Sequence, residues 1–166
     1  MRQLMLTARL LAACVVPFAG AAAKAADTVS VRGLSDASFG TITNFAADAV
    51  RSESVCLHAK SPPTDNYSIT ASGSGAGGAF LLSSGSDTLT YEVQWSDVPN
   101  RTSGTQLLAN MALTGQHSTS GTGSPDDCST GPATTASLVV ILRSSALSAA
   151  SSGTYGGTLT LLVAPE

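Results

Sequence analysis

Apolar and polar residues alternate with a period of two along several stretches of this chain. The clearest stretch is residues 89–95, and the pattern returns at residues 67–71 and 155–163. Side chains in a β-strand point alternately to opposite faces, so each stretch predicts a strand with one apolar face. The apolar members are Tyr67, Ile69, Ala71, Leu89, Tyr91, Val93, Trp95, Tyr155, Leu159, Leu161 and Val163.

Other stretches predict further elements with weaker patterns. Residues 138–142 form a continuous apolar run, which is typical of a strand covered on both faces. Two short segments, 45–50 and 144–150, have helical character. The remaining candidate strands are residues 28–32, 38–43, 50–59, 79–83 and 107–114.

Turn-forming residues separate these candidate strands. Clusters of Gly, Pro, Asn and Ser occupy residues 61–63, 73–78, 83–87, 99–104 and 115–131. Short strands punctuated in this way favour an all-β fold, an antiparallel β-sandwich.

The amino-terminal 25 residues have the pattern of a signal peptide. Arg2 and Arg9 precede an apolar run over residues 10–23, and Ala23-Lys24-Ala25 forms a cleavage site. The run is too short for a transmembrane helix. We therefore expect residues 1–25 to be removed and residues 26–166 to form one domain, exported through the inner membrane to the periplasm and then the cell surface or medium. A lipoprotein box ending at Cys14 is the alternative, but Arg9 interrupts the apolar segment it needs.

Signal cleavage would leave an acidic and sparsely charged protein. Removing three basic residues leaves 5 of the 8 against 11 acidic residues, a net charge of about −6. Charged residues make up 11% of the chain, below the usual quarter. This balance argues against nucleic acid and anionic membrane surfaces as partners, because both require basic patches.

The predicted mature chain holds two cysteines, Cys56 and Cys128. In an oxidising compartment an even pair is most simply one disulfide, here closing a loop of roughly seventy residues and stabilising the fold by about 4 kcal/mol. The alternative is two separate thiols.

No pattern of catalytic or metal-binding residues stands out. His58 and His117 are far apart, and His58 beside Cys56 would be poorly aimed as a nucleophile pair. Residues 73–78 match G-x-G-x-x-G, but no helix follows them, so they are interpreted as a turn. Asp65 with Asp126 and Asp127 could bind a cation only if their loops converged. We therefore expect a non-enzyme without metal or cofactor.

Tyr91 and Trp95 allow two interpretations. They share a face with Leu89 and Val93, which favours a place in the core. Alternatively, they could form a partly exposed platform that stacks on a sugar.

Three motifs resemble a known family. Phe39-Gly40-Thr41-Ile42 is similar to the "F-G-x-[IVY]" entry strand of the spore coat protein U domain, shared with pilins of the archaic chaperone–usher class. Leu89-Thr90-Tyr91-Glu92-Val93 is similar to its "L-x-Y-x-[LV]" strand. Residues 153–161 are similar to its closing "G-x-Y-x-[DG]-x-[VL]-x-[VL]" strand. The motifs occur in the family's order and span most of the predicted mature chain.

The resemblance implies an immunoglobulin-like sandwich that lacks its last strand, and a subunit of a fimbrium (pilus) with a role in cell adhesion. In that family a periplasmic chaperone lends the missing strand, an outer-membrane usher assembles the fibre, and the next subunit's extension then fills the groove. The expected groove walls here are Tyr155, Leu159, Leu161 and Val163.

This chain departs from the family in two places. Family members carry a first-strand cysteine bonded to one in the second strand. Cys56 fits the second position, but residues 28–39 hold no cysteine, so Cys128 would have to serve. The possible donor strand, residues 26–33 with Val29 and Val31, is short. The alternative function is a monomeric secreted or periplasmic sandwich that binds a ligand such as carbohydrate.

Overall fold

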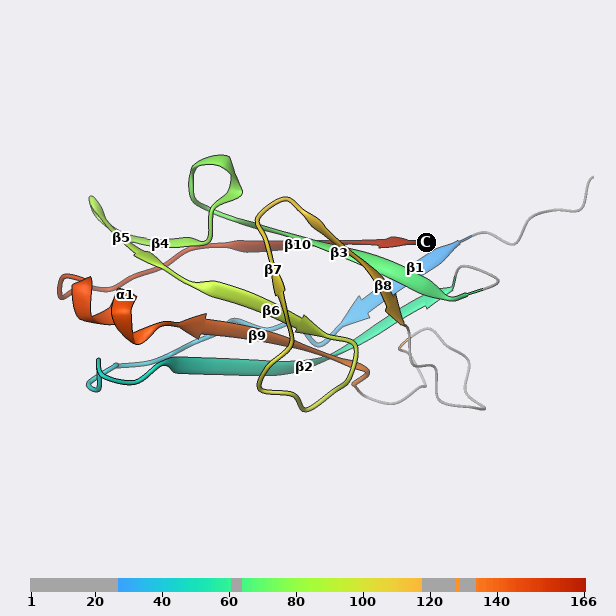
Figure 1. The fold of residues 1–166 in the computed structure, drawn as a ribbon, viewed down its shortest axis with the longest axis horizontal. Helices are drawn as coiled ribbons and strands as arrows, with labels where there is room; N and C mark the ends of the chain where they lie inside the picture. Colours follow the sequence, from blue (N-terminus) through green and yellow to red (C-terminus); the bar gives the residue numbers. More distant parts are fainter. Residues whose placement is uncertain (1–26, 61–63, 118–127, 129–133) are drawn as a thin grey trace, which may run out of the picture.

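The computed structural model describes residues 27–60, 64–117, 128 and 134–166, which form two facing antiparallel sheets and a hairpin (Figure 1). The larger sheet has the order β1-β2-β9-β6-β7, and the smaller has the order β10-β3-β8. The hairpin pairs β4 with β5. The strands are β1 (Thr28–Arg32), β2 (Ala49–Lys60), β3 (Asn66–Gly73), β4 (Leu81–Ser84), β5 (Asp87–Thr90), β6 (Glu92–Ser96), β7 (Thr105–Leu107), β8 (Ala112–His117), β9 (Ala136–Leu142) and β10 (Leu159–Pro165).

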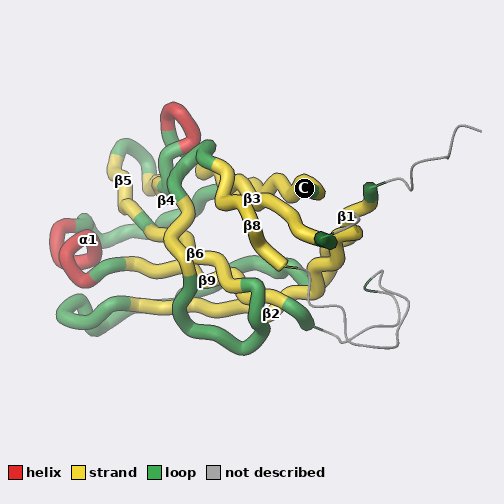
Figure 2. The backbone as a smooth tube through the Cα atoms, turned by 45° about the vertical axis from the view of Figure 1, so that its right-hand side comes forward, coloured by secondary structure: helices red, strands yellow, loops and turns green. Residues whose placement is uncertain are grey.

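The predicted all-β sandwich is confirmed. In the nomenclature of immunoglobulin sandwiches, β1-β2-β9-β6 corresponds to strands A-B-E-D, and β10-β3 corresponds to F-C. Among the described residues, no strand lies beside β10 at the position of strand G. Helix α1 (Ser144–Ala149) lies at one end of the sandwich and β1 at the other, as Figure 2 shows.

The core lies between the inner faces of the two sheets. Val55, Leu57 and Ala59 of β2 face Tyr67 and Ile69 of β3, and all five are at most 1% exposed. Every residue of β9 is buried, as its continuous apolar run predicted. The sandwich thus buries both faces of its central strand and one face of most others.

Several predicted elements match the structure closely. Residues 28–32 are β1, residues 50–59 lie within β2, and residues 67–71 lie within β3. The predicted helix at residues 144–150 is α1 (Ser144–Ala149). The predicted strand at residues 79–83 begins later, as β4.

Two predictions near residue 40 were wrong. Residues 38–43 belong to no strand, and Gly40 has φ of 63°, outside the strand conformation. Residues 45–50 form no helix, because the chain bends where Ala46 N–H donates to Asn44 Oδ1 (3.0 Å). Val50 then pairs with Ile141 in β2.

Two predicted strands are each divided into two. In residues 107–114, the Met111 N–H donates to the Leu108 carbonyl (3.1 Å) in a turn that carries the chain from β7 in one sheet to β8 in the other. In residues 89–95, Tyr91 separates β5 from β6, and its N–H donates to the Phe80 carbonyl (3.0 Å) in the register of the β4–β5 hairpin. The apolar alternation continues through this break.

A short 3₁₀ turn, η1 (Ala76–Gly78), lies between β3 and β4. Within the part of the chain that the structure describes, no helix is long and apolar enough to span a membrane. The predicted signal peptide (1–25) with Cys14, the turn at 61–63, and Asp126 and Asp127 lie outside the described residues.

Candidate functional site

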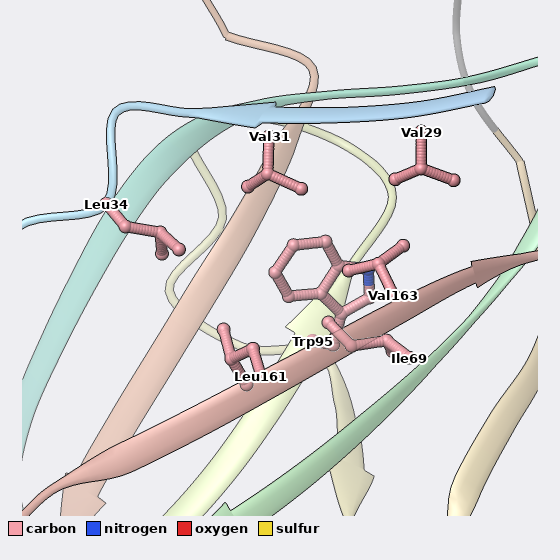
Figure 3. A pocket seen from close by; sticks show the side chains of 7 residues that line it. All are labelled: Val29, Val31, Leu34, Ile69, Trp95, Leu161 and Val163. Carbon is pink, nitrogen blue, oxygen red and sulfur yellow. The ribbon is translucent and has the colours of Figure 1, made fainter.

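A groove runs along the side of the sandwich where β1 and β10 end their sheets. It contains a cavity of about 240 Å³ between the two strands, which run in opposite directions (Figure 3). Among the described residues, β1 forms a strand ladder with β2 and β10 forms one with β3, and neither pairs with a further strand on the side that faces the other. The cavity is lined by Val29, Val31, Leu34, Ile69, Trp95, Leu161 and Val163.

Strand alternation explains why these side chains meet. Leu161 and Val163 occupy the inward-facing positions of β10, whereas Leu162 between them is 66% exposed on the outer face. Val29 and Val31 occupy the corresponding positions of β1. Trp95 lies at the floor of the cavity between the strands (Figure 3).

The cavity offers no free polar side-chain atom. Among the described residues that line the cavity, Trp95 alone has a polar side-chain atom, Nε1. This Nε1–H is not free, because it donates to Tyr67 Oη at 2.9 Å. Burial raises the pKa of Tyr67 to about 12, so its hydroxyl stays protonated. The site can therefore bind apolar side chains, and it lies beside two strand edges that no further strand of the described residues joins.

The spacing of the two edges bears on what can enter. Cα atoms of β1 and β10 approach within 8 Å. A strand paired to both would separate them by two strand spacings, roughly 9.5 Å. An entering strand would therefore move β1 and β10 apart slightly where they are closest.

Two of the four predicted groove-wall residues line the cavity, and the other two lie outside it. Leu161 and Val163 line the cavity. Leu159 lies on the same face of β10 but outside the cavity, and Tyr155 precedes the strand, with its hydroxyl donating to the Ser151 carbonyl (3.0 Å).

The sequence reasoning did not place Leu34, Ile69 and Trp95 in the groove. The alternation around Trp95 favoured a place in the core, and this is correct. The sequence near Trp95 does not indicate that the core is open to a groove beside it. The possible donor strand with Val29 and Val31 lies in the chain's own sheet, where Val29 pairs with Ala59 and Val31 with Leu57. Its residues form the second wall of the groove.

Cys56 and Cys128 form a disulfide, with a Cα–Cα distance of 5.8 Å. Cys56 lies in β2 opposite Arg32 of β1, and Cys128 Sγ lies 3.9 Å from the Ser30 carbonyl oxygen. The bridge therefore fixes residue 128 beside the β1–β2 pair. Because its sulfur is bonded, Cys56 cannot act as a nucleophile with His58.

The other candidate sites have structural explanations. Tyr91 and Trp95 are 7% and 1% exposed, so the favoured interpretation that both belong to the core is confirmed and the alternative of an exposed sugar-stacking platform is wrong. Residues 73–78 end β3 and form η1, with β4 next. Among the described residues, no three His, Cys, Asp or Glu side chains converge as metal ligands.

The fold is similar to that of a solved fimbrial assembly. One matching chain comes from the work described as "Chaperone-tip adhesin complex is vital for synergistic activation of CFA/I fimbriae biogenesis", with a TM-score of 0.54 and 13% sequence identity. It covers 84% of this chain and 41% of that chain, so this chain spans less than half of its neighbour.

No family model matches the sequence, and no curated protein matches it. The resemblance to the spore coat protein U domain therefore stays a prediction. At this level of identity the structural likeness concerns the fold alone, and it supports the antiparallel β-sandwich described above.

Proposed function

We propose that this chain is a structural subunit of a chaperone–usher surface fibre, in which a strand from another polypeptide fills the groove between β1 and β10. The observation that carries this proposal is the apolar cavity flanked by the β1 and β10 edges, on which no further strand of the described residues pairs. An exposed edge beside an apolar surface promotes aggregation unless another strand covers it.

The chemistry of the groove suits an extended strand better than a small ligand. Pairing with the edges of β1 and β10 would satisfy the backbone groups of an added strand. Alternate side chains of that strand would enter the space between Leu161, Val163 and Val31. Each large aliphatic side chain buried there would contribute about 1.5–3 kcal/mol.

The proposed partners are a periplasmic chaperone, an outer-membrane usher and other fibre subunits. The structural neighbour's title describes a chaperone–tip adhesin complex, which supports partners of this kind. The Cys56–Cys128 disulfide suits an oxidising, extracytoplasmic compartment. Subunits joined by strand addition would form an open head-to-tail filament.

Adjacent residues of β10 provide a test with a built-in control. Leu161 lines the groove, whereas Leu162 is 66% exposed on the opposite face. We expect Leu161→Asp to prevent capture of a peptide with alternating valine and threonine residues, because a charge would be buried in the groove. Leu162→Asp should bind the peptide as the parent chain does. Equal peptide binding by all three proteins would contradict the proposal.

A further inference from the structure

The outer faces of the two sheets differ in how far they are covered. In the large sheet, Ser137, Val139 and Ile141 of β9 lie outside the core cluster, yet each is at most 5% exposed. In the small sheet, Leu162 of β10 points away from the core and is 66% exposed. One outer face is therefore covered, and the other is bare at Leu162.

The loop between β6 and β7, residues 97–104, covers the large sheet. Its Arg101 N–H donates to Ser137 Oγ (3.0 Å), and its Gly104 N–H donates to Gln94 Oε1 (3.0 Å). Both acceptors belong to neighbouring strands of the large sheet, β9 and β6. The sheet thus holds its own cover in place with side chains on its outer face.

The outer face of the small sheet consists of small, uncharged residues around Leu162. Strand pairing aligns Leu162 with Thr70 and Thr70 with Ala112, so one row of side chains crosses all three strands. The other outward positions hold only Ser, Thr or Ala, and together with this row they define the bare face. They are Ser68, Ser72, Thr114, Thr160 and Ala164.

Charge favours one kind of occupant for the bare face. The chain has a formal net charge of −3 at pH 7, so two copies repel each other in general. The bare face contains no Asp, Glu, Lys or Arg, so two copies can approach through it without like charges meeting. It also offers no charged group to a partner of opposite charge. This composition favours a second copy of this chain as the occupant.

Side-chain size determines how two bare faces pack together. Leu162 is the one large side chain of the face, and Ala112 lies in the same row two strands away. A two-fold axis along β3 would place β10 of each copy over β8 of the other. Leu162 would then pack on the small Ala112, whereas two opposed leucines would hold the rows of Ser and Thr apart.

We propose that the bare face pairs with the same face of a second copy, with Leu162 of each copy over Ala112 of the other. The face measures roughly 14 Å across three strands and 23 Å along β10, so a pair buries on the order of 600 Å². Stable complexes bury about 1,200 Å² or more, so this contact is weak by itself. Copies aligned in fibres would repeat it many times, and in this respect the inference rests on the proposed function.

Charge substitutions at Leu162 and Ala112 test the pairing. With the groove filled by the peptide of alternating valine and threonine, sedimentation of the parent chain at millimolar concentration should show a monomer–dimer equilibrium. Leu162→Glu and Ala112→Lys should each weaken association on the order of tenfold, because each places a charge against an uncharged face. Mixing these two variants should restore association, because their opposite charges meet.

Val50→Glu is the matched control. Val50 pairs with Ile141 in the large sheet and is 44% exposed, so its substitution adds the same charge away from the bare face and should leave association unchanged. Dilution of the parent chain should shift the NMR signals of amides in β10, β3 and β8 and leave those of β2 in place. A parent chain that stays monomeric, or a Leu162→Glu chain that associates as the parent does, would overturn the inference.

Peptide capture separates this inference from the proposed function. Capture by the parent chain and the variants alike shows that all of them fold, and it leaves the proposed function standing whatever the result on association. If the parent chain does not capture the peptide, the proposed function fails. The same dilution series on the chain alone then decides whether the bare faces pair.

Discussion

Trp95 and Tyr67 join the two sheets beneath the groove. The indole Nε1–H of Trp95, on β6, donates to Tyr67 Oη, on β3, at 2.9 Å. Their rings meet edge to face, with centroids 6.4 Å apart and planes at 90°. Both residues are 1% exposed, so this pair is a polar contact inside the apolar core and fixes the floor of the cavity.

Removing the Tyr67 hydroxyl should destabilise the fold. In Tyr67→Phe the Trp95 N–H stays buried without its acceptor, which should lower the free energy of unfolding by about 1–3 kcal/mol. Urea denaturation measures this loss. Tyr155→Phe is the matched control, because its hydroxyl bonds an exposed loop carbonyl and its removal should change stability little. Equal effects of the two substitutions would contradict the role assigned to Tyr67.

Tyr67 should also make stability depend on pH in the alkaline range. Burial raises its folded-state pKa from 10.0 to about 12, so the folded state favours the neutral phenol. This contribution is complete below about pH 10 and is lost as the pH rises toward about 12. Denaturant unfolding at increasing pH should show a steeper decline for the parent chain than for Tyr67→Phe. Identical slopes would argue against the raised pKa.

Loss of the disulfide should destabilise the fold through the unfolded state. Cys56→Ser should lower the free energy of unfolding by about 2–4 kcal/mol, because the bridge closes a loop between residues 72 positions apart. Cys128→Ser should have a similar effect, and the double variant should lose no more than either single one. Additive losses, measured by urea denaturation, would show that the cysteines act separately.

Asp48 should keep a low pKa even without its ion pair. Its pKa lies below 3.8 mainly because Ser144 N–H donates to Oδ1 (2.8 Å) at the start of α1, and Arg143 adds to this effect. We expect Arg143→Gln to raise the pKa of Asp48 only in part, as carboxyl NMR titration can measure. Any stability that Asp48 contributes is present above about pH 4 and is lost as the pH falls below it. A full return to 3.8 in the variant would contradict the assigned order of causes.

Strand positions could be predicted from the sequence where one face is apolar. Residues 67–71 alternate because β3 faces the core on one side only, and the continuous run at 138–142 reflects burial of β9 on both sides. The strand at 107–114 was predicted as one element because the turn at Leu108–Met111 contains apolar residues. The alternation of apolar and polar residues does not show where the chain passes from one sheet to the other.

The walls of the groove could be predicted only in part, because the apolar alternation of a strand does not show which sheet the strand joins. Leu161 and Val163 were expected as walls because the family resemblance marks the closing strand as an open edge. The opposite wall depends on which sheet β1 joins, and the alternation of Val29 and Val31 suits both its own sheet and a neighbour's. Residues 38–43 were predicted as a strand, but strand assignment requires backbone pairing, which Gly33 interrupts after β1.

The central claim is that the edge of β10 is completed by a strand from another polypeptide. Thermal unfolding and sedimentation of the purified chain, with and without the peptide of alternating valine and threonine residues, test this most directly. The account predicts that the chain alone aggregates or unfolds at low temperature, and that the peptide yields a stable monomeric complex. A chain that is monomeric and unfolds cooperatively alone, with no change on adding the peptide, would contradict it.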